Sequence, residues 1–151
     1  LLGAGITGLF ANASVNEDQR QEAQDILNGV GSSVWVADET QLDAVTAVSG
    51  SGPAYYFLLM ESMVASAQAL GLDAETSRKL VVETAKGAAL MACEPNADPQ
   101  TLRRNVTSPG GTTEAALRVM QEQGLSATVE NALKAAKNRA ETLALEFGSD
   151  A

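Results

Sequence analysis

Histidine is absent from the 151 residues of the sequence, and cysteine occurs once, at Cys93. Without histidine there is no Ser-His-Asp triad, no Cys-His pair and no imidazole ligand for a metal. A single cysteine excludes an intrachain disulfide, a Cys-x-x-Cys redox pair and a thiolate zinc cluster. We therefore expect no metal site. Any catalysis has to come from hydroxyls, carboxylates, backbone amides or a borrowed cofactor.

Positive charge is also scarce, because ten Lys and Arg stand against nineteen Asp and Glu, a net charge of −9. Binding to a phosphate backbone needs clustered cations, so we expect no nucleic-acid partner. No apolar run reaches the ~18 residues that a membrane span requires, so we expect no membrane insertion. The N-terminal residues of the sequence show no basic segment typical of a signal peptide, so we expect a cytoplasmic location. The chain begins with Leu1 rather than Met, and we expect it to be the tail of a longer protein.

The first 39 residues have the pattern of an α/β segment. Residues 3–12 are rich in glycine and β-favouring types and predict a loop followed by a short strand near 9–12. Ser14 and Glu17 fit a capping box that opens a helix ending at Gly29, and residues 34–36 predict a second strand. A strand–helix–strand of this size is too small to stand alone, so we interpret residues 1–39 as a remnant of an α/β sheet.

From residue 40 to 151 the pattern is helical almost throughout. We expect one long helical segment over 40–70, followed by helices that start at Asp73 and at Asp98-Pro99 and by further helices over 113–123 and 126–147. Ser49-Gly50-Ser51-Gly52-Pro53 interrupts the first segment. Two readings of it stay open: a loop between two helices, or a glycine face where another backbone packs closely.

Residues 3–8, GAGITG, match the G-x-G-x-x-G fingerprint of dinucleotide-binding loops. The fingerprint has a physical meaning only after a strand and at the opening of a helix, where the helix N-terminus receives the pyrophosphate. Here only two residues precede it and a predicted strand follows. We therefore reject it as a cofactor loop.

Residues 107–114, TSPGGTTE, join two predicted helices and carry the most informative pattern. Pro109 and two glycines permit a sharp turn whose N–H groups, with the positive end of the next helix, suit a carboxylate or a phosphate. Hydroxyl groups at Ser108, Thr112 and Thr113 add donors and acceptors. The simpler alternative is a plain turn in which Thr112 or Thr113 caps the helix and Glu114 favours its dipole.

Residues 42–55, LDAVTAVSGSGPAY, and 102–120, LRRNVTSPGGTTEAALRVM, closely resemble the pyrroline-5-carboxylate reductase family. The similarity extends over essentially the whole chain. It implies a mainly α fold: residues 40–151 as an all-helical dimerisation and substrate-binding domain, similar to the C-terminal domain of 6-phosphogluconate dehydrogenase, after the C-terminal remnant of a Rossmann domain at 1–39.

The resemblance implies an activity, the transfer of hydride from NADPH or NADH to the C=N bond of 1-pyrroline-5-carboxylate, which gives L-proline. It places the substrate carboxylate in the turn at 108–113, against Ser108, Thr113 and the amides of Gly110, Gly111 and Thr112. Thr113 matches the threonine whose hydroxyl hydrogen-bonds the ring nitrogen, and it is our candidate for positioning or relaying a proton there. Asn105 matches a position near the nicotinamide. Family members often carry a glutamate where this sequence has Asn96, so no carboxylate role is transferred there.

The resemblance also implies an intertwined homodimer, with assembly into rings as a further step. Because the nucleotide-binding strand–turn–helix is missing from the sequence, we expect these 151 residues alone to lack reductase activity. Two alternatives remain. One is a helical dimerisation module without catalysis. The other is a different imine or β-hydroxyacid reductase, although these usually use a lysine and none lies in residues 108–114.

Overall fold

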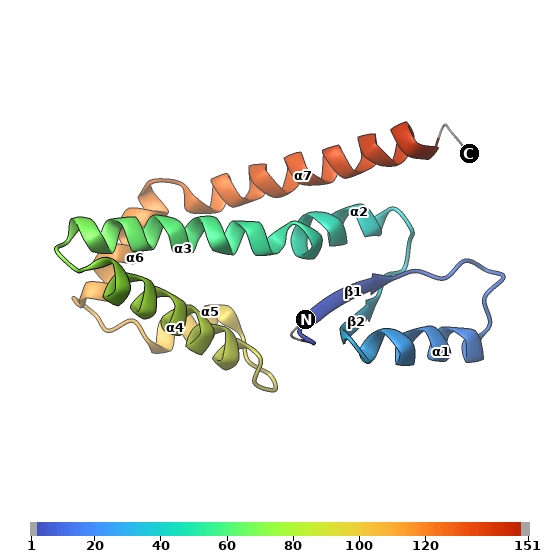
Figure 1. Ribbon diagram of the computed structural model, residues 1–151, viewed down its shortest axis with the longest axis horizontal. Coiled ribbons are helices and arrows are strands. Elements are labelled where there is room, and N and C mark those ends of the chain that lie inside the picture. Colours follow the sequence, from blue (N-terminus) through green and yellow to red (C-terminus); the bar gives the residue numbers. More distant parts are fainter. Residues whose placement is uncertain (1–2, 149–151) are drawn as a thin grey trace. The chain divides into compact units, whose positions relative to one another are not determined.

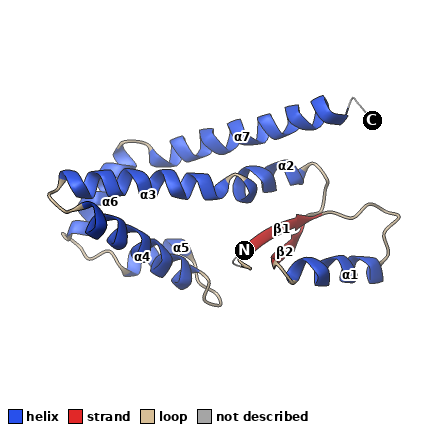
Figure 2. Ribbon diagram, in the orientation of Figure 1, coloured by secondary structure: helices blue, strands red, loops and turns tan. Residues whose placement is uncertain are grey.

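The computed structural model describes residues 3–148. It divides into two compact units, one formed by residues up to Pro53 together with those from Glu130 onward, the other by Ala54–Val129. Figure 2 shows that the strands lie near the N-terminus of the described chain and that its other elements are helices joined by loops. This confirms the mainly α fold with a small α/β segment. None of the helices within 3–148 combines the length and the apolar character needed to cross a bilayer.

The α/β segment consists of β1 (Gly5–Leu9), α1 (Glu17–Asn28) and β2 (Gly31–Trp35). The two strands are parallel and pair from Gly5 with Gly31 to Leu9 with Trp35, as can be followed in blue in Figure 1. The predicted strand–helix–strand is therefore present. Its first strand lies four residues earlier than expected, because the pairing with β2 selects residues 5–9 rather than 9–12.

The capping box at Ser14 is wrong. The N-cap of α1 is Asn16, whose side chain accepts from the Gln19 amide at 2.9 Å while the Gln19 side chain accepts from the Asn16 amide at 3.0 Å. Ser14 instead donates its amide to the Asn12 side chain, within the loop before the helix. The side-chain oxygen of asparagine can accept the capping hydrogen bond as a serine hydroxyl does. The capping box therefore exists, but it lies two residues later than predicted.

The glycines of residues 3–8 serve strand packing. Gly5 and Gly8 lie inside β1, and α1 begins only at Glu17, so the motif does not open a helix. A Cβ placed on Gly8 would come within 2.7 Å of a methyl group of Val45, which lies on α2 (Gln41–Val45). Glycine at this position thus allows α2 to approach β1 closely.

The interruption at residues 49–53 is not a loop. The helix α2 continues into a π-helical turn, η1 (Thr46–Gly50), and then into α3 (Gly52–Ala69). The Ser51 amide donates to the Thr46 carbonyl at 2.9 Å, which is the five-residue spacing of a π-turn. Pro53 falls in the first turn of α3, where its missing N–H costs little. No atom of the described chain lies within 4 Å of a Cβ built on Gly52, so the close helix crossing is not made within this chain.

The remaining helices are α4 (Ala74–Ala92), α5 (Pro99–Asn105), α6 (Thr112–Glu122) and α7 (Leu125–Gly148). The predicted starts at Asp73 and Asp98 are confirmed, because their carboxylates accept from the amides of Thr76 and Thr101, each at 2.8 Å. These hydrogen bonds lower the pKa of both carboxyl groups. For Asp73 the backbone bond from Thr76 has the largest effect, and for Asp98 the side chain of Thr101.

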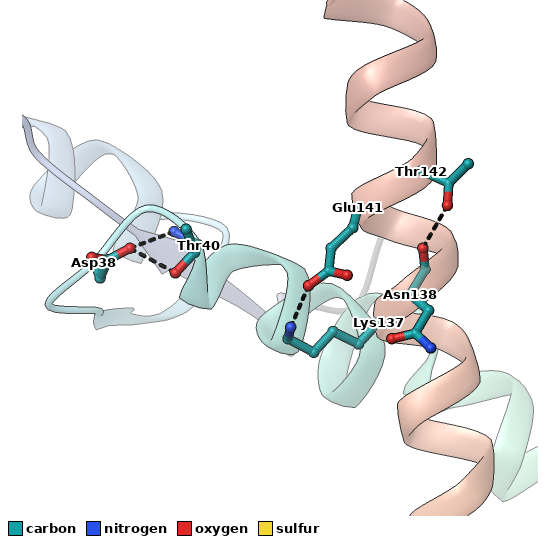
Figure 3. Close-up of polar contacts among 6 residues, drawn as sticks. All are labelled: Asp38, Thr40, Lys137, Asn138, Glu141 and Thr142. Carbon is teal, nitrogen blue, oxygen red and sulfur yellow. Dashed lines mark hydrogen bonds and ion pairs between the residues drawn. The ribbon is translucent and has the colours of Figure 1, made fainter.

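Within the first unit, Lys137 and Glu141 on α7 point toward each other, as Figure 3 shows. The hydrogen bond to Glu141 raises the pKa of Lys137 above its ordinary value, and the charge of Asp43 on α2 adds to the shift. In the loop that precedes α2, Asp38 accepts from the hydroxyl and the amide of Thr40 at 2.7 and 2.8 Å. These bonds, the side-chain one first, lower the pKa of Asp38.

Candidate functional site

The predicted anion-binding turn lies between α5 and α6, within the second unit. It begins where α5 ends, and the Thr107 hydroxyl donates to the Arg103 carbonyl at 2.6 Å. It closes where the Gly111 amide donates to the Ser108 carbonyl at 3.0 Å. Between these points Gly110 has a φ of +72°, a left-handed conformation that other residues adopt only under strain. At Gly111, the next residue, glycine is required by a close contact rather than by the backbone angle.

Gly111 is the N-cap of α6 and lies directly against Ser108. A Cβ on Gly111 would come within 2.5 Å of the Ser108 hydroxyl oxygen, so a larger residue would displace that side chain. The expectation that Thr112 or Thr113 caps the helix is wrong. Both are the first residues of α6, and no side chain caps this helix within the described range 3–148. Their hydroxyl groups are therefore not used in capping.

The backbone amides of the turn differ in what they already bind. The Gly110 amide donates to Oε2 of Glu114 at 2.8 Å, and the Gly111 amide donates to Ser108. The amides of Thr112 and Thr113 belong to the first turn of α6, where a helix provides no partner for its own N–H groups. Of the three predicted amides, those of Gly110 and Gly111 thus have partners inside the chain, whereas that of Thr112 stands at the helix start, where the helix supplies no partner.

A pocket of about 690 Å³ adjoins the turn. Its walls include Gly110 and Gly111 together with Glu114 and three arginines, Arg103, Arg104 and Arg118. Ser108, Thr112 and Thr113 are not among its lining residues. The turn therefore presents its two glycines to this pocket. Asn105 ends α5, and no hydrogen bond joins it to Thr113 in the part of the chain that the structure describes.

The loop before α5 contains Asn96, the position at which the resemblance implies a glutamate in other family members. Asn96 has a φ of +61°, and asparagine is one of the few residues other than glycine that tolerate this conformation. It lines a second pocket of about 390 Å³ together with Glu94 and Asp98. Because Asp98 accepts from Thr101, its carboxylate serves the start of α5.

No cluster of three or more His, Cys, Asp or Glu side chains lies close enough to hold an ion among residues 3–148.

Comparison with known proteins places the chain in a family. The family model described as "Pyrroline-5-carboxylate reductase dimerisation" matches residues 39–143. The chain belongs to this family. The match begins at the point where the sequence changes from the α/β pattern to the helical one, and it includes the turn between α5 and α6.

Curated relatives agree with the family model. The chain is 51% identical over 148 residues to a pyrroline-5-carboxylate reductase of Pseudomonas aeruginosa, covering 98% of this chain and 54% of that protein. It is 47% identical to one of Haemophilus influenzae, covering 97% and 55%. The chain thus spans about half the length of the curated relatives it matches.

Solved structures show the same similarity in three dimensions. A pyrroline-5-carboxylate reductase of Coxiella burnetii is 48% identical with a TM-score of 0.90, covering 93% of this chain and 52% of that one. A Plasmodium falciparum pyrroline carboxylate reductase, crystallised with NADP bound, is 33% identical with a TM-score of 0.80, covering 93% and 53%.

One contact in the turn was not found by sequence reasoning. The sequence predicts for Glu114 only a favourable charge at a helix start, whereas its side chain binds the amide of Gly110. The signal was present, because a glutamate at the third position of a helix can reach back to an amide before the helix. The reach to Gly110 rather than to the N-cap depends on the left-handed turn, which spacing alone does not indicate.

Proposed function

We propose that the protein acts as a pyrroline-5-carboxylate reductase, reducing the C=N bond of 1-pyrroline-5-carboxylate to give L-proline. The observation that carries the proposal is the turn at 108–113, which opens α6 with uncapped amides inside the segment that the family model matches. The relatives of P. aeruginosa and H. influenzae bear this name and support it.

The turn offers groups suited to the substrate's carboxylate. We infer that Ser108, Gly110, Gly111, Thr112 and Thr113 form this site, the two glycines by shaping the turn, because their amides already have partners within the chain. The first amides of α6 carry the positive end of the helix dipole, which favours an anion although the chain as a whole is acidic. Holding the carboxylate fixes the ring of the substrate relative to the turn.

Thr113 is the proposed catalytic residue. Its hydroxyl can donate to the ring nitrogen or accept from it, and it is not used for capping α6. As the imine becomes an amine, the nitrogen gains basicity and has to receive a proton. A hydroxyl held beside it positions or relays that proton, so the absence of histidine is no obstacle.

The proposed cofactor is NADPH, with NADH as the alternative, and it supplies the hydride when bound. The P. falciparum relative with bound NADP supports a nicotinamide cofactor. The glycines at residues 3–8 do not fit its pyrophosphate, because Gly5 and Gly8 lie in β1 and the next helix, α1, begins only at Glu17. In the described chain, Asn105 at the end of α5 is our candidate contact to the nicotinamide.

Substitution of Thr113 tests the catalytic assignment. We expect Thr113→Val in the complete gene product to lower kcat for 1-pyrroline-5-carboxylate reduction by about 10²-fold or more, since the proton loses its hydroxyl path. Thr113→Ser keeps the hydroxyl and should stay within about fivefold of the wild type. Thr84→Val on the exposed face of α4 serves as the control. Wild-type turnover by Thr113→Val would contradict the catalytic role of Thr113, whereas a wild-type protein without any turnover would favour a dimerisation module without catalysis.

We also propose that the protein forms an intertwined homodimer that assembles further into rings. The description of the matched family model as a dimerisation domain supports self-association. Large apolar side chains on α3, among them Tyr56, Phe57 and Leu58, are exposed in the single chain and supply the surface for it.

A further inference from the structure

Glu114 makes the most specific contact in the turn. Its Oε2 accepts a hydrogen bond from the Gly110 amide at 2.8 Å. The carboxylate is charged and the amide belongs to a left-handed glycine with a φ of +72°. The contact is exposed to solvent, which weakens it, but a carboxylate is a stronger acceptor than a neutral oxygen, so the bond favours the observed conformation of Gly110.

A second bond closes the same turn from the other side. The Gly111 amide donates to the Ser108 carbonyl at 3.0 Å, and Gly111 lies against the Ser108 side chain. The two bonds together determine the direction of the backbone between Ser108 and Thr112. They leave the amides at the start of α6 and the hydroxyls of Ser108, Thr112 and Thr113 as the groups of the turn that can receive a ligand.

The surroundings of Glu114 explain how a negative charge is tolerated beside a site for a carboxylate. Arg103, Arg104 and Arg118 line the same pocket as Glu114. No ion pair within 4 Å joins them to Glu114 among residues 3–148. Glu114 is therefore available to the Gly110 amide. The three positive charges around the pocket offset the negative charge of Glu114 on this side of the turn.

We propose that Glu114 is a positioning residue for substrate binding. By accepting the hydrogen bond from the Gly110 amide, a contact we call the clamp, it holds the turn at 108–113 in the conformation that binds the substrate's carboxylate. This inference rests on the proposed function, because it assigns Glu114 a role in that same carboxylate site. Glu114 does not touch the reacting atoms. Since the carboxylate is held equally in the ground state and in the transition state, loosening the clamp raises KM and leaves kcat nearly unchanged.

Three variants of the complete gene product test the clamp. Glu114→Ala removes the acceptor, and we expect KM for 1-pyrroline-5-carboxylate to rise about tenfold with kcat within about twofold. Glu114→Gln retains an oxygen acceptor and should keep KM within about threefold of the wild type. Glu75→Ala is the matched control, because Glu75 also lies in the first turn of a helix and supports its dipole. It should leave KM unchanged.

Amide exchange measured by NMR without substrate provides a second readout. We expect the Gly110 amide to exchange faster in Glu114→Ala than in the wild type and in Glu114→Gln. Wild-type exchange in Glu114→Ala overturns the clamp, as does a KM equal to that of Glu75→Ala. A fall in kcat at constant KM overturns the positioning role in favour of proton transfer. A wild-type protein that does not reduce 1-pyrroline-5-carboxylate refutes the proposed function and the positioning role with it, whereas the exchange rates still decide whether the clamp exists.

Discussion

Ser77 on α4 is completely buried, with 0% of its surface exposed. Its hydroxyl has no hydrogen-bond partner among residues 3–148. Burying a polar group without a partner is unfavourable, because the hydroxyl gives up its bonds to water and gains none in return. Burial of the Ser77 hydroxyl therefore lowers the free energy of unfolding of the protein.

Replacing Ser77 should stabilise the protein. We expect Ser77→Ala to raise the free energy of unfolding by about 1 kcal/mol or more, through the lost desolvation penalty and the better helix propensity of alanine. Ser66→Ala is the control, since the Ser66 hydroxyl is exposed and donates to the Ser62 carbonyl at 2.8 Å. Urea unfolding followed by circular dichroism measures both. A Ser77→Ala variant less stable than Ser66→Ala would contradict the prediction.

At the scale of elements, aspartates determine where α4 and α5 begin. The Asp73 and Asp98 carboxylates accept amide hydrogen bonds at the helix starts, and these bonds lower the pKa of each carboxyl group. A depressed pKa in the folded state means that the contribution to stability is fully present above the unfolded value near 3.8. It is lost as the pH falls through the lower folded value. Acid therefore weakens the starts of these two helices.

The Asp73→Asn variant isolates this effect. Asparagine caps a helix about as well as aspartate but does not titrate in this range, so the variant should lose less stability than the wild type between about pH 5 and 3. Thermal unfolding by circular dichroism across this range provides the comparison. Parallel pH profiles for the two proteins would show that the Asp73 charge does not contribute.

At the scale of the whole molecule, the apolar content is poorly buried within one chain. The sequence is 45% apolar, yet only Ala47 and Val81 are buried apolar side chains in the described residues. Phe57 on α3 is 65% exposed, and its neighbours Tyr56 and Leu58 are exposed to a similar degree. Exposed apolar surface of this kind marks an interaction site in a folded protein. The family's dimerisation description identifies a second copy as the occupant we expect.

A charge on α3 should prevent this association. We expect Phe57→Glu to convert the protein from a dimer to a monomer at micromolar concentration, because the glutamate would be buried without a partner. Ile26→Glu on α1, outside the segment that the family model matches, should leave the dimer intact. Sedimentation velocity distinguishes the two states. A wild-type protein that sediments as a monomer, or a dimeric Phe57→Glu, would contradict the prediction.

By itself, the sequence determined the features that depend on a few neighbouring residues. Asp73 and Asp98 start helices because each carboxylate bonds an amide three residues later, and the turn at Gly110-Gly111 follows from residue types that permit it. The family could be identified from the same segments. The boundary between residues 39 and 40 and the roles of Thr113 and Asn105 stay predictions.

Tertiary structure decided the features that join residues distant along the chain or that choose among similar local options. The start of β1 depends on its pairing with β2. The need for glycine at position 8 depends on Val45, which packs against it. The π-helical turn at η1 shows that residues 49–53 are not a loop, one of the two readings that the sequence leaves open, and the Gly110 amide donates to Glu114. Spacing indicates which groups can meet. Only the folded backbone, by placing those groups at bonding distance, determines which of them do.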